Sequence, residues 1–151
     1  MDFVIETEIA RAPADVFAYV ADPAKLSTWQ TNTVSAVPEP DGPITKGSRI
    51  HEVHRAPGGK EMHSLVEIVD YEPDRAFGMR VVEGPPIHGE ITLEPSDEGT
   101  RMRFRVHAQP SGAMRLAEPI LRLMLKRQFR RHCTTLKRLL EQLPSGTRHL
   151  T

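Results

Sequence analysis

The last third of the chain, residues 113–143, is one long amphipathic segment, and it most constrains the possible fold. Its apolar residues recur at steps of three and four, which places side chains on one face of a helix. At about 1.5 Å per residue, such a helix approaches 45 Å and cannot bury its apolar face alone. The preceding region must therefore supply a broad apolar partner. The apolar positions are Leu116, Ile120, Leu121, Met124, Leu125, Phe129, Cys133, Leu136, Leu140 and Leu143.

The region before this helix is predicted to hold two short helices and about seven strands. The first short helix begins at Pro13, and the second begins with Asp22 as N-cap and Pro23 at its first position, ending near Trp29. Pro119 marks either a kink in the long helix or its true start. Turn signals separate the predicted strands, which cover residues 3–9, 33–37, 48–55, 60–71, 75–82, 87–94 and 100–108.

This order of elements predicts an α+β fold. Consecutive hairpins form an antiparallel sheet, and a twisted sheet of this size curls. A long helix across the concave side would enclose a space between helix and sheet, and the two short helices would close one end of it. We expect residues 1–143 to form a single ligand-binding domain and residues 144–151 to form a flexible tail.

Composition and cysteine usage indicate a cytoplasmic protein. Apolar residues make up 38% of the chain, yet they form no run of about 18 that would cross a membrane. The first residues lack the basic and apolar regions of a secretory signal. Cys133 is the only cysteine, so an intramolecular disulfide is impossible, as is typical of a reducing compartment.

The charges are distributed unevenly, although the formal net charge is zero. The charged residues among positions 1–45 are mostly acidic, whereas those on the polar face of the long helix are mostly basic. We interpret this face as a solvated surface that the acidic region partly neutralises. The alternative is an anionic partner such as RNA or a membrane surface. No RNA-binding motif supports that alternative, and we expect no nucleic acid partner.

Several short runs of the sequence carry a resemblance to a known family. They are residues 12–23, followed by Leu26 and Trp29, and residues 46–49, 69–73, 92–95 and 99–101. Together with the long C-terminal helix, they resemble the polyketide cyclase/dehydrase and lipid-transport family of the START, or Bet v 1-like (SRPBCC), superfamily. The resemblance implies a helix-grip fold with an elongated apolar cavity. Members of this family bind hydrophobic ligands or cyclise polyketides.

Residues that face the expected cavity are predicted from the apolar phase of the strands and the apolar face of the long helix. Methionine suits such a wall because its side chain adapts to irregular apolar ligands, although it fills ordinary cores equally well. Trp29 either stacks on a ligand or anchors the short helices to the sheet. The predicted ligand-binding residues are Trp29, Met62, Ser64, Phe77, Met79, Ile91, Phe104, Leu121, Met124, Leu125, Gln128 and His132.

Catalytic residues are not identified, but the candidates are Glu52, His54 and His132. The strand at 48–55 is ambiguous because a shift of one residue exchanges its inner and outer side chains. If Glu52 and His54 point inwards, they could form an acid/base pair, whereas an inward Arg49 would recognise a carboxylate or phenolate. His132 lies at the edge of the helix's apolar stripe, where it could move protons or simply reach water.

A metal site and a cofactor are not expected. His51, His54 and His63 are close in one hairpin, but His51 and His54 lie on opposite faces of a strand and cannot converge on zinc. Nucleotide-binding and nucleophile motifs are missing from the sequence.

The expected function is binding of a small hydrophobic ligand, such as a lipid or an aromatic polyketide, by a monomer or a homodimer. Whether the protein is an enzyme stays open. The first alternative is a polyketide cyclase/dehydratase that uses acid/base residues in the cavity. The second is a protein- or ribosome-interaction module that uses the basic face of the long helix.

Overall fold

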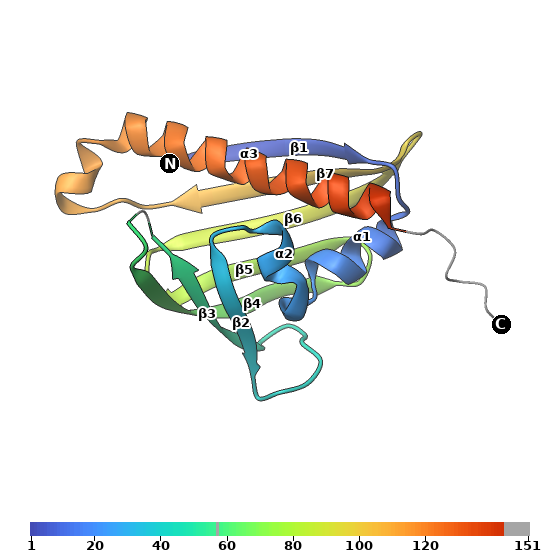
Figure 1. Cartoon of the computed structure of the whole chain (residues 1–151), viewed down its shortest axis with the longest axis horizontal. Helices are drawn as coiled ribbons and strands as arrows, with labels where there is room; N and C mark the ends of the chain where they lie inside the picture. Colours follow the sequence, from blue (N-terminus) through green and yellow to red (C-terminus); the bar gives the residue numbers. More distant parts are fainter. Residues whose placement is uncertain (57, 144–151) are drawn as a thin grey trace.

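The computed structural model describes residues 1–56 and 58–143, and within them a curled sheet of seven strands is crossed by a long C-terminal helix (Figure 1). The strands are β1 (Asp2–Ile9), β2 (Thr33–Glu39), β3 (Arg49–Arg55), β4 (Glu61–Glu72), β5 (Ala76–Glu83), β6 (Ile87–Ser96) and β7 (Gly99–Ala108). The helices are α1 (Pro13–Val20), α2 (Leu26–Trp29) and α3 (Glu118–Gln142), with 3-10 helices η1 (Pro23–Lys25) and η2 (Gly112–Arg115).

The predicted fold class and element order are confirmed. The Asp22 side chain accepts a hydrogen bond from the backbone N–H of Ala24 at 3.0 Å, as expected of an N-cap. Pro119 lies in the first turn of α3 and therefore marks the start of the helix. The tail expected at residues 144–151 lies outside the described residues. Among the described helices, none has the combined length and apolarity that a bilayer crossing requires.

The sheet has the order β1-β7-β6-β5-β4-β3-β2, and every neighbouring pair is antiparallel. Its inner face is apolar, as β7 illustrates with buried Met102, Phe104 and Val106. Figure 1 shows α3 running along β1, and α2 contacts both α3 and β2. The helix therefore packs over one side of the curled sheet, while the two short helices cover part of the remainder.

The outer face of the β1–β7 pair carries a ladder of ion pairs between directly opposed residues. Arg101 donates to Glu8 at 2.7 Å and Arg103 donates to Glu6 at 2.8 Å. The hydrogen bond from Arg101 lowers the pKa of the Glu8 carboxyl below its usual value. The predicted alternation of buried apolar and solvated basic residues along β7 is thus confirmed.

The second half of α3 is the part that belongs to the core. Cys133, Leu136 and Leu140 are fully buried. Two polar contacts hold this half to the N-terminal strand: Lys137 Nζ donates to the carbonyl of Glu8 at 2.6 Å, and the backbone N–H of Ala10 donates to Glu141 at 2.9 Å.

The apolar stripe predicted for the long helix was wrong in the first half of α3 and at its C-terminal end. The buried stripe passes through Leu125, Phe129 and Cys133, which pack in or against the core. Leu116 precedes α3, whereas Ile120 and Met124 lie on a second stripe of the helix. It is offset from the first by one residue, or about 100° around the helix. Accordingly Leu116, Ile120 and Met124 are exposed, as is Leu143 at the C-terminal end.

Candidate functional site

The structure resolves the orientation of β3, which the sequence left open. Ile50 and Glu52 are buried on the inner face of the sheet, whereas Arg49 and His51 are exposed on the outer face. His51 instead contacts Glu39 on the edge strand, with 3.0 Å between Nε2 and Oε2. An inward Arg49 is therefore excluded.

Glu52 and His54 form a hydrogen-bonded pair on this inner face. Glu52 is only 5% exposed, and its Oε1 lies 2.9 Å from His54 Nε2. The other ring nitrogen, Nδ1, lies 3.3 Å from the hydroxyl of Thr33 on β2. In the tautomer that fits this geometry, Nε2–H donates to the carboxylate and Nδ1 accepts the Thr33 hydroxyl proton. The carboxylate thereby orients the imidazole.

The strand register explains this cluster. Glu52 is directly opposite Ser64 on β4 and Ala36 on β2, while His54 is opposite Thr33. Residues paired across antiparallel strands share a face, so Thr33, Glu52, His54 and Ser64 gather at one place. The position of Thr33 beside His54 could not be read from the sequence, because it depends on a bulge in β2 that sets the pairing with β3.

His132 lies on α3, and its imidazole is buried. Burial lowers the pKa of His132 to about 4, with smaller contributions from the charges of Arg131 and His54. The ring is therefore neutral near neutral pH. Its Nδ1 is buried and has no hydrogen-bond partner among the described residues.

Trp29 completes the aromatic part of the site and is fully buried. Its ring centroid lies 6.2 Å from that of Phe104, which lies 5.2 Å from Phe129, which in turn lies 5.6 Å from the His132 ring. This row of rings connects α2 through β7 to α3. Trp29 Nε1 is the second buried polar side-chain atom that has no partner in the described part of the chain. A buried polar atom without a hydrogen-bond partner reduces stability by about 1–3 kcal/mol. A hydrogen bond from a bound molecule to Trp29 Nε1 or His132 Nδ1 would therefore be favourable.

The inner face is only partly covered beside this cluster. We call this region the uncovered inner face, and it consists of half-buried side chains on β5, β6 and α3. Among the described residues, α2 contacts β2 and α3, and α3 contacts β1, while Met79, Ile87 and Leu125 are only partly buried against the core. Its residues are Met79, Val81, Ile87, Leu121, Leu125 and Gln128.

The structure places the predicted ligand-binding residues in three groups. Trp29, Ser64, Phe77, Ile91 and Phe104 are buried, as is His132. Met79, Leu121, Leu125 and Gln128 belong to the uncovered inner face.

Two of the predicted ligand-binding residues lie elsewhere. Met62, opposite His54 and 38% exposed, lies at the rim of the sheet. The prediction for Met124 was wrong. Its side chain is 58% exposed on the outward stripe of α3, because the buried stripe passes through the adjacent Leu125.

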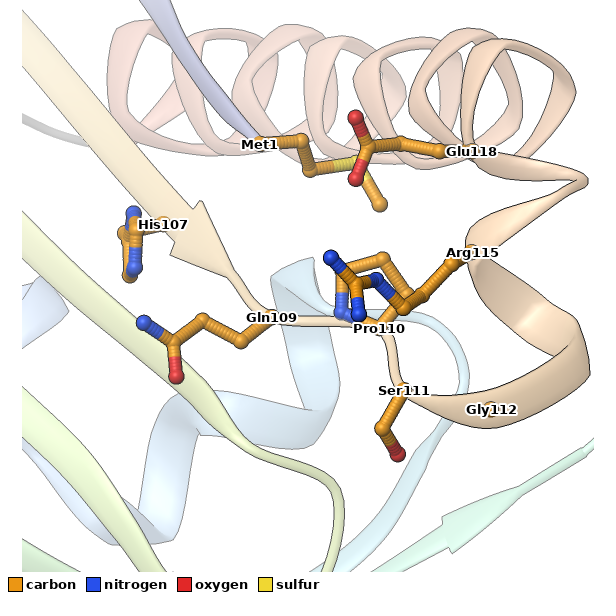
Figure 2. A pocket seen from close by; sticks show the side chains of 8 residues that line it. All are labelled: Met1, His107, Gln109, Pro110, Ser111, Gly112, Arg115 and Glu118. Atoms are coloured by element: carbon orange, nitrogen blue, oxygen red, sulfur yellow. The ribbon is translucent and has the colours of Figure 1, made fainter.

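An open hollow of about 390 Å³ lies between the end of β7 and the start of α3 (Figure 2). None of its lining side chains is buried, and His107 within it already contacts Asp2, with 2.6 Å between Nδ1 and Oδ1. Glu52 and His54 are not part of it, so we assign it no binding role. Its lining residues are Met1, His107, Gln109, Pro110, Ser111, Gly112, Arg115 and Glu118.

Comparison with known proteins gives a consistent picture. A family model described as polyketide cyclase / dehydrase and lipid transport matches residues 1–141. Protein NE0264 from Nitrosomonas europaea superposes with a TM-score of 0.75 at 18% identity, over 94% of this chain and 95% of that chain. TTHA0849 from Thermus thermophilus superposes with a TM-score of 0.71 at 19% identity, over 94% and 95% of the two chains.

A third similar structure is the di-domain ARO/CYC protein StfQ from the steffimycin biosynthetic pathway. It superposes with a TM-score of 0.77 at 17% identity, over 93% of this chain and 50% of that chain. This chain therefore spans half the length of StfQ. No curated protein sequence matches the chain. At these identities the likeness of the solved structures establishes the fold.

Proposed function

Because the chain belongs to the polyketide cyclase / dehydrase and lipid transport family, we propose that it binds a small hydrophobic ligand bearing an oxygen atom. The observation that carries this proposal is the pair of unpartnered buried nitrogens, Trp29 Nε1 and His132 Nδ1. A phenolic aromatic polyketide or a lipid carboxylate has the required chemistry. Its apolar part would lie against the uncovered inner face, and its oxygen would accept a hydrogen bond.

The apolar surface supplies most of the binding free energy in this proposal. Burial of apolar surface contributes about 25 cal/mol per Å². Met79, Leu121 and Leu125 are half-buried without a ligand and would lose their remaining water contact when one binds. Met79 adds adaptability, since a thioether side chain conforms to irregular partners. The two nitrogens would then set the orientation of the ligand.

Trp29 makes this proposal directly testable, because it is the only tryptophan in the chain. A dihydroxyanthraquinone and oleic acid, titrated separately, should quench or shift the fluorescence of Trp29 in a saturable way. The His132→Phe variant should bind the quinone roughly tenfold more weakly, since it loses one hydrogen bond of about 1.4 kcal/mol.

The matched control is Met124→Gln, which changes a residue on the outward stripe of α3 and should leave the titration unchanged. Native mass spectrometry of the purified protein provides a second, independent readout. Saturable binding of neither probe, together with a ligand-free mass, would refute the proposal.

The second candidate function is catalysis of polyketide cyclisation or dehydration, and the Glu52–His54 hydrogen bond favours it. In this proposal His54 Nδ1, released from its long contact with Thr33, removes a proton from a carbon between two carbonyl groups. The Glu52 carboxylate stabilises the imidazolium that forms. The carbanion then attacks a second carbonyl of the same chain, and the imidazolium returns its proton to the resulting alkoxide.

A linear poly-β-ketone thioester would test this candidate, with cyclised product measured by chromatography. Loss of the base in His54→Gln should slow product formation by about 10²–10⁴-fold. The Trp29 fluorescence titration should remain close to that of the parent, which would separate turnover from binding. The control is His51→Gln, which changes a residue of the same strand on the outer face of the sheet. Equal product formation with and without protein would reject the enzymatic role.

A further inference from the structure

The first turns of α3, together with the η2 segment just before them, present apolar side chains that do not pack in the core. Leu116 is 91% exposed, Ile120 is 65% exposed and Leu123 is 57% exposed. Met114 and Met124 beside them are also more than half exposed. We call these five residues the α3 apolar patch. Contiguous exposed apolar patches are uncommon on monomeric proteins and commonly mark an interaction site.

The same side of the helix becomes cationic further along. Within α3, Ile120, Leu123, Arg127 and Arg130 follow one another at steps of three, four and three, which places them on one stripe, and Leu116 lies just before the helix begins. Arg131 adjoins this stripe, four residues after Arg127. All three arginines are exposed, and none pairs with a carboxylate within the described part of the chain. Apolar and cationic groups are therefore segregated along the helix axis.

We propose that the outer side of α3 docks on an anionic lipid surface. The α3 apolar patch would insert below the headgroups, and Arg127, Arg130 and Arg131 would lie at the anionic headgroups. This disposition suits a helix that lies in a membrane interface, where apolar side chains reach about 5–10 Å into the bilayer.

Charge complementarity favours this partner over the others. A second copy of the chain would present the same arginines to this surface and no matching acidic groups from it. Nucleic acid would match the arginines but would leave the patch of leucine, isoleucine and methionine exposed. An anionic bilayer satisfies both parts at once, because lipid tails accept the apolar residues and headgroups attract the cations.

The position of the patch also relates it to the candidate site. Leu121 and Leu125 of the uncovered inner face flank Leu123 and Met124 of the patch in the sequence of α3, and the two pairs lie on different sides of the helix. Docking would place this part of α3 between the bilayer and the uncovered inner face. The docking proposal does not depend on ligand binding, and the two have separate readouts.

The test is flotation of the full chain with phosphatidylcholine vesicles, with and without phosphatidylserine. We expect flotation with the anionic vesicles only, and release at high salt. The triple variant Arg127→Glu, Arg130→Glu, Arg131→Glu should weaken binding by roughly a hundredfold or more, given about fivefold for each cation at an anionic surface. The triple variant Leu116→Gln, Ile120→Gln, Leu123→Gln should also abolish flotation.

The matched control variants introduce the same kinds of substitution at exposed positions of the strands and of the turn before β5. They are the triple Arg55→Glu, Arg75→Glu, Arg105→Glu and the double Val4→Gln, Val37→Gln, and both should float like the parent. Circular dichroism verifies that every variant is folded. The Trp29 titration with dihydroxyanthraquinone should be unchanged in the α3 variants, which keeps failure of docking distinct from failure of ligand binding.

Failure of the parent protein to float, or equal flotation of the arginine variant, would overturn the proposal. A dimer that the glutamine triple dissociates, without vesicle binding, would assign the patch to a second copy and also overturn it. Binding to RNA without vesicle binding would do the same. A Leu123→Trp variant gives the positive signature: emission that shifts to shorter wavelength on anionic vesicles, while Trp29 stays buried.

Discussion

His132 and Cys133 are adjacent on α3, and burial moves their pKa values in opposite directions. Burial lowers the pKa of His132 to about 4 and raises that of Cys133 to about 12. The common cause is that removal from water disfavours the charged form, which is the acid form of histidine and the base form of cysteine. Both side chains are consequently neutral at neutral pH, and each gives a measurable consequence.

For His132, stability should decrease as the pH falls from about 6.5 towards 4. In this range the unfolded chain binds a proton at His132 that the folded chain does not, so acid favours unfolding. The full loss amounts to about 3 kcal/mol. Urea unfolding at several pH values should show a flatter dependence for His132→Phe than for the parent. Two curves with the same slope would contradict burial of a neutral His132.

For Cys133, the folded protein should resist alkylation. The reactive species is the thiolate, which a pKa of about 12 makes scarce, and the side chain is also out of contact with water. Iodoacetamide should label the protein slowly in buffer and rapidly in urea, as followed by mass spectrometry. Rapid labelling without denaturant would show that this part of α3 opens readily.

At the scale of elements, α3 is divided between a half that holds the core together and a half that lies largely in solvent. Leu136 is fully buried, whereas Leu123 is 57% exposed, so one residue type occurs in both environments. The difference arises because α3 is anchored by Lys137 and Glu141 to the end of β1, while its first turns extend over the uncovered inner face. The turns of α3 that stabilise the core are therefore different from those that carry the proposed docking surface.

The two leucines provide a matched pair of substitutions. Leu136→Ala should reduce the free energy of unfolding by about 2–5 kcal/mol, because it leaves a cavity in a packed core. Leu123→Ala should change it by less than about 0.5 kcal/mol, since it removes surface that is already hydrated. Urea denaturation monitored by circular dichroism measures both. Similar losses for the two variants would mean that the first half of α3 is packed in solution.

Sequence patterns predicted these elements well where one periodicity dominated. The alternation of Met102, Phe104 and Val106 with basic residues identified the inner face of β7, and Asp22 and Pro119 marked helix starts correctly. β3 was undecided because polar residues occupy both of its phases, and its orientation follows from the burial of Ile50 and Glu52 in the folded sheet. Met124 was misplaced because two apolar stripes, offset by one residue, merge when read as a single pattern.

The candidate site was harder to predict than the fold, for a physical reason. Trp29, Glu52 and His132 lie far apart in sequence, and only the complete sheet brings their elements together. Thr33 carried no signal of its own, since a threonine at the start of a strand is ordinary. Phe129 was recognised as apolar, but its position between Phe104 and His132 depends on where α3 crosses the sheet.

At the scale of the whole molecule, the interior has a closed end and an open end. The closed end holds Val16, Met102 and Leu140, all without solvent exposure or nearly so. The open end is the uncovered inner face, where Val81 and Leu121 remain half-buried. In the ligand-binding proposal, the ligand would contact the half-buried side chains of the open end and leave the fully buried ones in place.

This division predicts a gradient of amide hydrogen exchange along α3. Residues 133–140 should exchange only through global unfolding, since Leu136 and Leu140 lose their buried contacts only when the fold is lost. Residues 120–125 should exchange roughly tenfold faster or more, because local opening there breaks few buried contacts. Exchange measured by mass spectrometry on overlapping peptides resolves the two segments, and β7 serves as an internal reference for global unfolding.

The same measurement distinguishes the two uses proposed for this end of the molecule. Dihydroxyanthraquinone should slow exchange around Leu121 and Gln128, which face inwards, and also at His54 across the sheet. Anionic vesicles should slow exchange in residues 114–124 and leave β3 unchanged, because they contact only the outer side of α3. Uniform protection along α3 in the free protein would contradict the open end, on which the ligand-binding proposal rests.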